Sequence, residues 1–231
     1  MLKNTLINRG VTRKIAVALG ELNEQVVYVG GAVVSLYIDD PSADDVRPTK
    51  DIDVSMQIET LGELEKIRMD LRKKGFYQSP EDTVVCRFRY EDIKVDVMAT
   101  KPIGWAPGNE WFEQGFAHIF TKEIDNITIK LLPLPYYLAT KFSAFYDRGI
   151  KEPRISHDFE DIVYILNYTS DLKEQILKAE NPVKEYLKNA FLQILSGRVL
   201  QEAIIANLYY EQQTARFNKI MITIKSICDA I

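Results

Sequence analysis

Residues 28–54, YVGGAVVSLYIDDPSADDVRPTKDIDV, carry the pattern from which the fold can be predicted. A β-branched and aromatic run ends at Gly30-Gly31, a short apolar segment follows, and a polar loop then leads to Asp51 and Asp53. A glycine pair between a strand and a helix forms a tight turn whose backbone amides can approach an anion. We therefore expect a strand, a glycine turn and a helix ahead of a second strand that carries two carboxylates.

The second expected strand has one apolar and one polar side. Asp51 and Asp53 alternate with Ile52 and Val54, which is the period of a strand with one buried face. The two carboxylates then point the same way, about 6.5–7 Å apart along the chain. Asp96 interrupts the apolar run IKVDVM in the same manner. If the two strands are neighbours in the sheet, three carboxylates converge.

Three carboxylates without counter-charges would repel one another and destabilise the fold, so their convergence favours bound cations. Mg²⁺ prefers oxygen ligands and bridges carboxylates to substrate phosphates, and a pair of ions can activate an attacking hydroxyl. We expect Asp51, Asp53 and Asp96 to bind two Mg²⁺ ions, or Mn²⁺ in their place, beside a nucleoside triphosphate. The third carboxylate can accept the proton of the hydroxyl. The open alternative is that these aspartates are solvated residues of an edge strand.

Hydrophobic spacing predicts the remaining elements. In the N-terminal part, helices are expected over 11–22, 32–38 and 61–74, the last one ending at Gly75, and strands over 26–29, 51–56, 84–90, 93–98 and 127–131. The strands over 84–90 and 93–98 are expected to form a hairpin that turns at Glu91-Asp92. After Pro135 the spacing becomes helical, over 136–147, 159–167, 183–195 and much of 197–231.

These patterns predict an α/β (α+β) fold with a mixed sheet, flanking helices and a helical C-terminal region. We expect two domains, residues 1–132 with the carboxylates and residues 133–231 with the helices. The aromatic residues of the segment KPIGWAPGNEWFEQG, Trp105, Trp111 and Phe112, can either stack on a base or pin this segment onto the core, and we favour the second role.

The composition is that of a globular protein with a substantial core: 231 residues, 46% of them hydrophobic and 27% charged. A net charge of −4 argues against coating nucleic acid by bulk attraction, although it is compatible with a local basic groove. Cys86 and Cys228 have no ligand-like spacing, so we expect no disulfide framework and no structural zinc. Without a secretory signal or a run long enough to cross a bilayer, we expect a cytoplasmic protein with no membrane partner.

The glycine turn followed by Asp-x-Asp resembles the first motif of the DNA polymerase β-like nucleotidyltransferase superfamily. The closer resemblance is to the AbiEii/AbiGii toxin-like group, whose Arg-x-Thr/Ser-x-Asp-x-Asp pattern fits residues 47–53, RPTKDID. This resemblance implies a nucleotidyltransferase fold in which Asp51 and Asp53 bind metal and Asp96 is the third catalytic carboxylate. It also implies that Gly30, Gly31 and Thr49 contribute to nucleotide binding.

The same group has a helical lysine that contacts the triphosphate, then an arginine, then an Asp-x-x-Asp helix. Residues 138–148, LATKFSAFYDR, and 157–162, HDFEDI, look like these segments, so the resemblance assigns Lys141, Arg148 and Asp158 to nucleotide binding. Lys141 and Arg148 are two helical turns apart and share a face. Asp158 can orient Lys141 or act as a further acid or base. The alternative is an ordinary ion pair of Arg148 with Asp158 or Asp161.

The resemblance covers residues 26–166 and implies an enzyme that moves a nucleoside monophosphate from NTP to an acceptor and releases pyrophosphate. For this group the acceptor is expected to be RNA, such as tRNA, or a protein, and a cognate antitoxin is expected. Two alternatives stay open. One is a nucleotidyltransferase that inactivates a small molecule, such as an aminoglycoside or lincosamide antibiotic, and the other is a binding module that has kept the fold and lost the chemistry.

Overall fold

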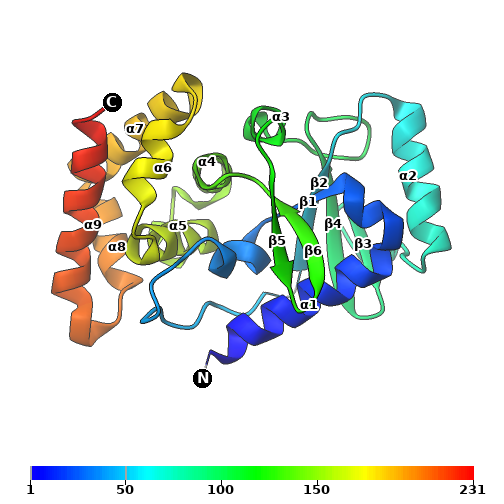
Figure 1. Ribbon diagram of the computed structural model, residues 1–231, viewed down its shortest axis with the longest axis horizontal. Helices are drawn as coiled ribbons and strands as arrows, with labels where there is room; N and C mark the ends of the chain where they lie inside the picture. The colour runs from blue at the N-terminus through cyan, green and yellow to red at the C-terminus, as the bar shows by residue number, and fades with distance from the viewer. Residues whose placement is uncertain (1, 50) are drawn as a thin grey trace. The chain divides into compact units, whose positions relative to one another are not determined.

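In the part of the chain that the computed structural model describes, residues 2–49 and 51–231, the strands form one six-stranded sheet (Figure 1). Its order is β3-β4-β2-β1-β6-β5. The strands are β1 (Val26–Val29), β2 (Asp51–Met56), β3 (Arg87–Tyr90), β4 (Ile93–Ala99), β5 (Phe120–Ile124) and β6 (Ile127–Leu131). β2 runs parallel to β4 and β1 parallel to β6, while the other neighbours are antiparallel. The predicted mixed sheet is confirmed.

β4 shows why the strands were predictable. Ile93, Val95 and Val97 are buried, whereas Lys94 and Asp96 between them are half-buried. This alternation gives the strand one face on the core and one polar face. β1 has no polar face, because it lies between β2 and β6 and all four of its residues are buried.

The first helix begins earlier than its hydrophobic spacing predicts. We expect a helix over 11–22, but α1 spans Lys3–Leu19 and a 3₁₀ segment, η1 (Gly20–Gln25), follows it. The first turns of α1 contact the polar segment 45–49 through side chains such as Asn8. Because their buried side is polar, these turns carry no apolar stripe that would mark them as helical.

α2 (Leu61–Lys73) ends where the sequence predicts. Its N-terminus carries a capping box, in which the Thr60 hydroxyl accepts from the Glu63 amide and the Glu63 carboxylate accepts from the Thr60 amide. Gly75 follows the helix with a φ of 89°, the left-handed conformation that glycine adopts at helix ends.

Several short elements differ from the predictions, among them β3, which begins at Arg87 where a strand over 84–90 was expected, and α6 (Leu172–Lys178), which was not predicted. The expected helix over 32–38 is a single 3₁₀ segment, η2 (Gly31–Leu36). The segment 101–115, for which no helix was predicted, leads into a helix, α3 (Glu110–Phe116). β5 escaped prediction because only its last residue, Ile124, is buried, so an edge strand with exposed side chains shows no alternation.

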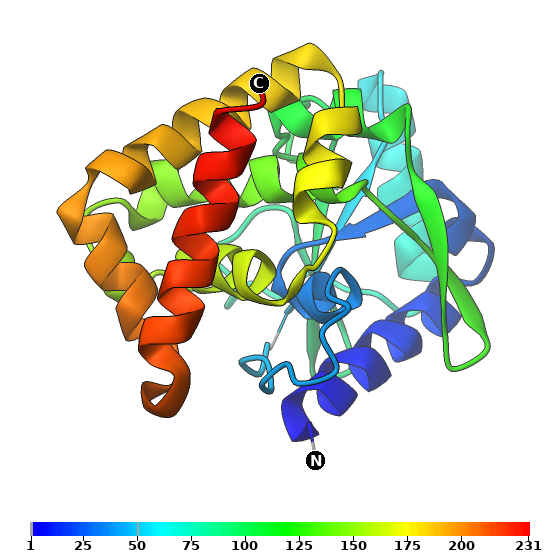
Figure 2. The same cartoon turned by 60° about the vertical axis from the view of Figure 1, so that its left-hand side comes forward.

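The C-terminal part is helical, as predicted. Figures 1 and 2 show these helices side by side, with α4 against α5 and α7, and α9 against α6 and α7. Their aromatic core includes Phe142, Phe145, Phe159 and Phe191, all fully buried. The helices are α4 (Leu134–Ala144), which continues into a π-helical turn, η3 (Phe145–Gly149), and then η4 (Pro153–Ile155), α5 (His157–Tyr168), α6 (Leu172–Lys178), α7 (Asn181–Ser196), α8 (Arg198–Ala206), η5 (Tyr210–Gln212) and α9 (Gln213–Cys228).

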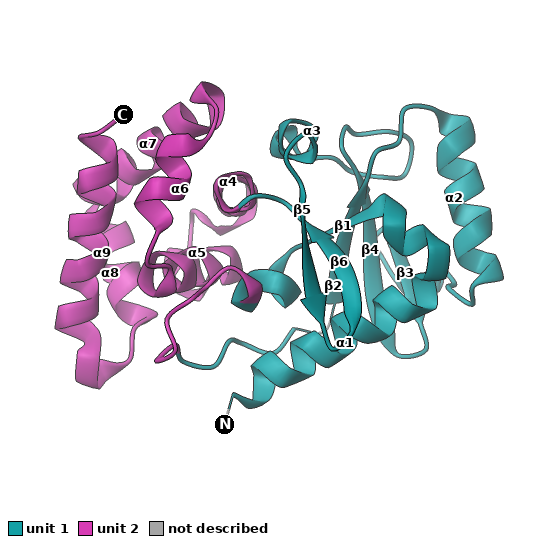
Figure 3. Ribbon diagram, in the orientation of Figure 1, with its two compact units in different colours: residues 1–35, 44–133 teal, residues 36–43, 134–231 magenta. Residues whose placement is uncertain are grey.

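The chain divides into two compact units, residues 1–35 with 44–133 and residues 36–43 with 134–231 (Figure 3). The short segment 36–43 packs with the helices of the second unit, because the Tyr37 ring stacks on Tyr137 with centroids 4.2 Å apart. The backbone amides of Asp39 and Asp40 donate to the carbonyl oxygen of Tyr168. The sequence does not predict that residues 36–43 belong to the helical unit. The domain boundary between residues 132 and 133 stays a prediction.

Candidate functional site

The sheet brings the three predicted carboxylates onto one face. β2 and β4 are in register with Asp53 opposite Asp96, and β4 and β3 are in register with Asp96 opposite Arg87. Paired residues of neighbouring strands point to the same face, so Arg87, Asp96 and Asp53 form a row across three strands. Asp51 lies two residues before Asp53 and shares this face. The strands that carry Asp51, Asp53 and Asp96 are thus neighbours, and the three residues share one face of the sheet.

The glycine turn packs directly against this row. β1 ends at Val29, which is opposite Asp53, and Gly30 follows with a φ of 72°. A Cβ atom on Gly30 would lie 1.8 Å from Oδ2 of Asp53, so only glycine leaves room for this carboxylate. Gly31 is buried and begins the short η2 segment. The predicted turn is present, although the segment after it is shorter than the expected helix.

A residue that sequence reasoning missed, Arg87, joins the carboxylates. Its Nε and Nη2 atoms donate to the two carboxylate oxygens of Asp96 at 2.7 and 2.6 Å, and Nη2 lies 3.6 Å from Oδ2 of Asp51. The signal was present in the predicted hairpin. A two-residue turn at Glu91-Asp92 sets Arg87 opposite Asp96 by counting back along the two strands.

This arginine is held in a mostly buried ion pair. The side chains of Arg87 and Asp96 are 14% and 13% exposed, while that of Asp51 is 41% exposed. Hydrogen bonding to Asp96 raises the pKa of Arg87 further above its ordinary value, so the guanidinium is a permanent positive charge. The same face also carries Lys94, which the register places opposite Asp51.

The donor set fits a hard divalent cation. Carboxylate oxygens are the ligands that Mg²⁺ prefers, and Asp51, Asp53 and Asp96 supply them from two adjacent strands. Arg87 already places a positive charge on Asp96 and near Asp51, as a cation would. Among residues 2–49 and 51–231, no group of three or more His, Cys, Asp or Glu side chains stands close enough together to hold an ion. The oxygen donors thus suit Mg²⁺ in kind, while Asp51, Asp53 and Asp96 are not gathered closely around one point.

The loop that leads to Asp51 is tied to α1. The Thr49 hydroxyl donates to Oδ1 of Asp51 at 3.0 Å, and the Thr49 amide donates to the side-chain oxygen of Asn8 at 3.2 Å. The Asn8 amide nitrogen in turn donates to the carbonyl oxygen of Arg47, and Asn8 is 1% exposed. Asn8 is a second residue that sequence reasoning missed, since nothing local marks a contact that spans about forty positions.

Lys141, Arg148 and Asp158 lie in the second unit, on α4, η3 and α5. Lys141 is 4% exposed, and its Nζ lies 2.6 Å from Oδ2 of Asp161 and 3.6 Å from Oδ1 of Asp158. Arg148 Nε donates to Oδ2 of Asp158 at 2.8 Å. Both cations thus lie close to Asp158, and the ion pair of Arg148 with Asp158, the alternative role, is present. Asp161 is the closer partner of Lys141, which the sequence does not indicate.

The aromatic residues of segment 101–115 have the structural role that we favoured. Trp111 and Phe112 are 5% and 3% exposed on α3. Trp105 packs edge-on against Phe88, with centroids 5.5 Å apart, and the guanidinium of Arg68 lies over its ring. These contacts pin the segment onto the sheet unit.

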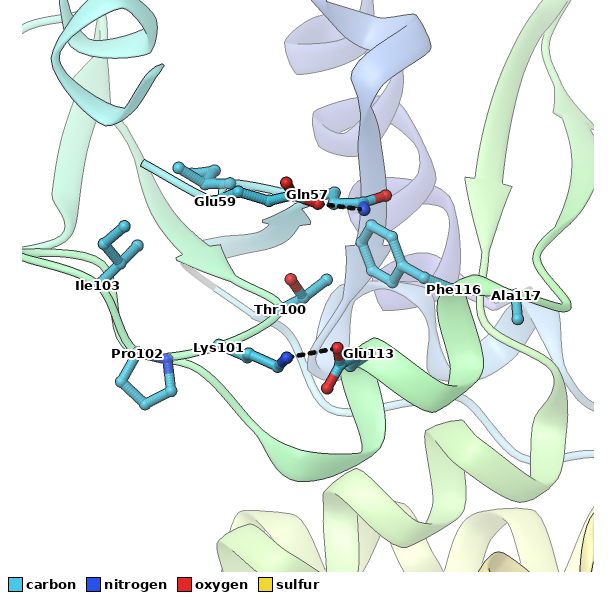
Figure 4. Close-up of a pocket in the computed structure, with 10 residues that line it drawn as sticks. Gln57, Glu59, Thr100, Lys101, Pro102, Ile103, Glu113, Phe116 and Ala117 are labelled. Carbon is cyan, nitrogen blue, oxygen red and sulfur yellow. Dashed lines mark hydrogen bonds and ion pairs between the residues drawn. The ribbon is translucent and has the colours of Figure 1, made fainter. Parts of the chain in front are cut away.

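A cavity of about 520 Å³ lies in the first unit (Figure 4). It is lined by residues that follow β2 and β4, including Glu59 and Thr100, whereas Asp51 and Asp53 lie at the start of β2. Lys101 and Glu113 pair at 2.6 Å across one side of it. The cavity therefore lies at the opposite ends of the two parallel strands and contains none of the predicted site residues.

The chain belongs to the AbiEii toxin family: the family model "Nucleotidyl transferase AbiEii toxin, Type IV TA system" matches residues 16–225. It is accordingly a nucleotidyltransferase of a toxin-antitoxin family, which confirms the resemblance found in its motifs. Among the residues that the structure describes, no helix is both long and apolar enough to cross a membrane.

Two solved structures are similar to this chain. An antigenic nucleotidyltransferase-like protein from Paracoccidioides brasiliensis is 16% identical with a TM-score of 0.50, over 86% of this chain and 92% of that one. JHP933 from Helicobacter pylori is 12% identical with a TM-score of 0.47, over 94% of this chain and 90% of that one. The first likeness confirms the nucleotidyltransferase-type fold. No curated protein matches the sequence.

Proposed function

We propose that this nucleotidyltransferase moves a nucleoside monophosphate from an NTP to a hydroxyl acceptor, with Asp51, Asp53 and Asp96 as its catalytic centre. The observation that carries the proposal is the register of β2 and β4, which sets Asp53 opposite Asp96 with Asp51 on the same face. The tight contact of Gly30 with Asp53 supports it, because a turn that could bind phosphate then lies beside the carboxylates.

Asp51, Asp53 and Asp96 would hold two Mg²⁺ ions, or Mn²⁺, which when bound supply Lewis-acid stabilisation of the phosphates and lower the pKa of the acceptor hydroxyl. Thr49 orients Asp51 through its hydroxyl, and Gly30 leaves the space that Asp53 fills. These two residues and Gly31 form the part of the proposed nucleotide site that lies in the first unit.

The proposed reaction is a single displacement at phosphorus. The acceptor oxygen forms a bond to the α-phosphorus of the NTP, and the bond from that phosphorus to the oxygen bridging to the β-phosphate breaks. The proton of the acceptor hydroxyl passes to Asp96, and pyrophosphate leaves with the electron pair of the broken bond. The products are the nucleotidylated acceptor and pyrophosphate.

We further propose that Lys141, Arg148 and Asp158 bind the triphosphate. Lys141 is suited to this role because Asp161 and Asp158 fix its ammonium group in one place. Arg148 keeps a side chain that is 68% exposed while it is anchored at Nε to Asp158, so its remaining donors can reach a phosphate. In this proposal Asp158 orients both cations.

The proposed acceptor is a macromolecule, either RNA such as tRNA or a protein. Membership of a type IV toxin-antitoxin family supports this class over a small antibiotic, and it supports an antitoxin as the partner of the chain. The site chemistry is common to all of these acceptors, so labelling must separate them.

The test is incubation of the purified protein with Mg²⁺ and each α-³²P-labelled NTP, with and without total RNA, followed by electrophoresis. We expect a labelled RNA or protein band that disappears in Asp53→Asn and persists in Asp92→Asn. Asp92 is a matched control because it is an exposed aspartate in the turn between β3 and β4. Near-normal labelling by Asp53→Asn would remove Asp53 from the catalytic centre. The absence of label on any macromolecule would contradict the proposed acceptor class.

A further inference from the structure

We propose that Arg87 supplies a permanent positive charge to the carboxylates of Asp51, Asp53 and Asp96, the carboxylate cluster. We also propose that it competes with the metal for Asp96 and Asp51. This inference rests on the proposed metal site and assigns it a positioning residue. Without metal, the guanidinium holds the two carboxylates together, and metal binding requires it to release or share them.

The geometry shows a contact that covers the oxygens a metal would use. Arg87 engages both carboxylate oxygens of Asp96 through two parallel hydrogen bonds, the strong fork arrangement of arginine and carboxylate. The same Nη2 atom lies 3.6 Å from Asp51 on the next strand. One guanidinium therefore bridges two of the three proposed metal ligands, across β4.

The neighbouring arginine of the same strand pairs with an acid away from these carboxylates. Arg89 lies two residues on and shares the face of Arg87. Its Nε and Nη2 atoms bind Asp82 at 2.7 and 2.9 Å, and Asp82 is outside the carboxylate cluster. The register sets Arg87 opposite Asp96 and Arg89 opposite Lys94, so of these two arginines Arg87 is the one that faces the cluster.

Competition follows from charge and space. A divalent ion bound to Asp96 would meet a fixed positive charge on the same carboxylate, and like charges at such short range oppose each other strongly. Arg87 cannot lose its charge by deprotonation, so it must move or weaken its contact. The same contact keeps Asp96 paired before the metal binds, which removes the cost of a mostly buried lone charge.

The test uses Mn²⁺ alone, without nucleotide, and measures free Mn²⁺ by electron paramagnetic resonance during titration of each variant. We expect Arg87→Gln to bind Mn²⁺ at least about tenfold more tightly than the natural protein, because a charge-assisted pair no longer competes. Arg89→Gln removes the same charge from the same face and strand, and its Mn²⁺ dissociation constant should change by about twofold at most. Arg87→Lys should lie between, since lysine keeps the charge and loses the fork.

Two results would overturn the inference: unchanged or weaker Mn²⁺ binding by Arg87→Gln, or an equal gain in Arg89→Gln. If Arg87→Gln does not fold, Arg87→Lys decides, and the inference then requires tighter binding than in the natural protein. Asp53→Asn separates this inference from the proposed function. If Mn²⁺ binding by the natural protein is insensitive to Asp53→Asn, the proposed metal site itself is wrong.

Discussion

Gly30 and the carboxylate of Asp53 are in direct contact, so that a methyl group on Gly30 would lie 1.8 Å from Oδ2 of Asp53. The φ of 72° at Gly30 is in addition a conformation that other residues rarely adopt. The glycine is thus needed twice, once for the backbone and once for the space beside a proposed metal ligand.

We predict that Gly30→Ala abolishes nucleotide transfer and lowers the free energy of unfolding. Backbone strain alone costs about 1–3 kcal/mol. Asp53 must move to admit the methyl group, which disrupts the carboxylate cluster. Labelling and urea denaturation measure the two effects. Gly10→Ala is the control, since a Cβ there meets nothing within 4 Å on helix α1, and it should stabilise by roughly 0.5–1 kcal/mol. An active Gly30→Ala variant would contradict the assignment.

Lys141 is expected to contribute to stability as well as to substrate binding. Lys141→Met leaves Asp161, which is 2% exposed, without its closest cation, and breaking a buried pair in this way costs about 3–5 kcal/mol. Arg148→Gln should cost no more than about 1 kcal/mol, because that side chain is largely exposed.

The double variant Lys141→Met with Asp161→Leu separates the two roles of Lys141. It removes both charges, so most of the lost stability should return, while the affinity for NTP should stay low. Equilibrium binding of a fluorescent NTP measures the second quantity. Normal NTP affinity in the stable double variant would show that Lys141 is only a structural residue.

Asn8 is expected to position the loop that carries Thr49. Asn8→Ala removes the partner of the Thr49 amide and a donor to the Arg47 carbonyl, at a cost of about 1–3 kcal/mol in stability. Transfer activity should fall at temperatures at which the variant is fully folded, because Thr49 orients Asp51. Ile7→Ala, on the exposed side of α1, serves as the control. Equal activities of the two variants would show that the loop needs no such tether.

The helical unit should lose stability in acid through Asp40. Hydrogen bonds from Ser42 and from Arg216 hold the pKa of Asp40 well below its ordinary value of 3.8. A lowered folded-state pKa stabilises the protein above the unfolded value, and this contribution is lost as the pH falls. We predict a decline in unfolding free energy from about pH 5 to pH 2 that is shallower in Asp40→Asn. Identical slopes in urea titrations across this range would contradict the assignment.

The sheet was predictable where the sequence alternates. β4 and β2 have one buried and one polar side, so period-two spacing set their bounds and faced their aspartates the same way. β5 and α3 were not predictable in this way. β5 buries one residue only, and α3 is seven residues long, too short for a clear helical period.

The acidic residues of the candidate site were predictable from the sequence, whereas several residues that contact this site were not predicted. Asp51, Asp53 and Asp96 stand out in the sequence because a carboxylate in an apolar strand costs free energy unless a partner or a cation compensates its charge. Arg87 was missed although the hairpin register implies it, because an arginine on a strand face is common. Asn8 and Asp161 act through contacts between distant parts of the chain, which one sequence does not reveal.

The segment 36–43 connects the glycine turn of the first unit to the loop before Asp51, yet it belongs to the second unit. The chain therefore passes between the units three times, and no single cut separates them. A fragment that ends at residue 132 would keep the segment and lose its partners Tyr137, Tyr168 and Arg216. In the whole chain, local unfolding of the helical unit would free residues 36–43, which lead directly into the loop before Asp51. Proteolysis, temperature or a ligand that acts on the helices alone could thus change the activity of the carboxylates without touching them.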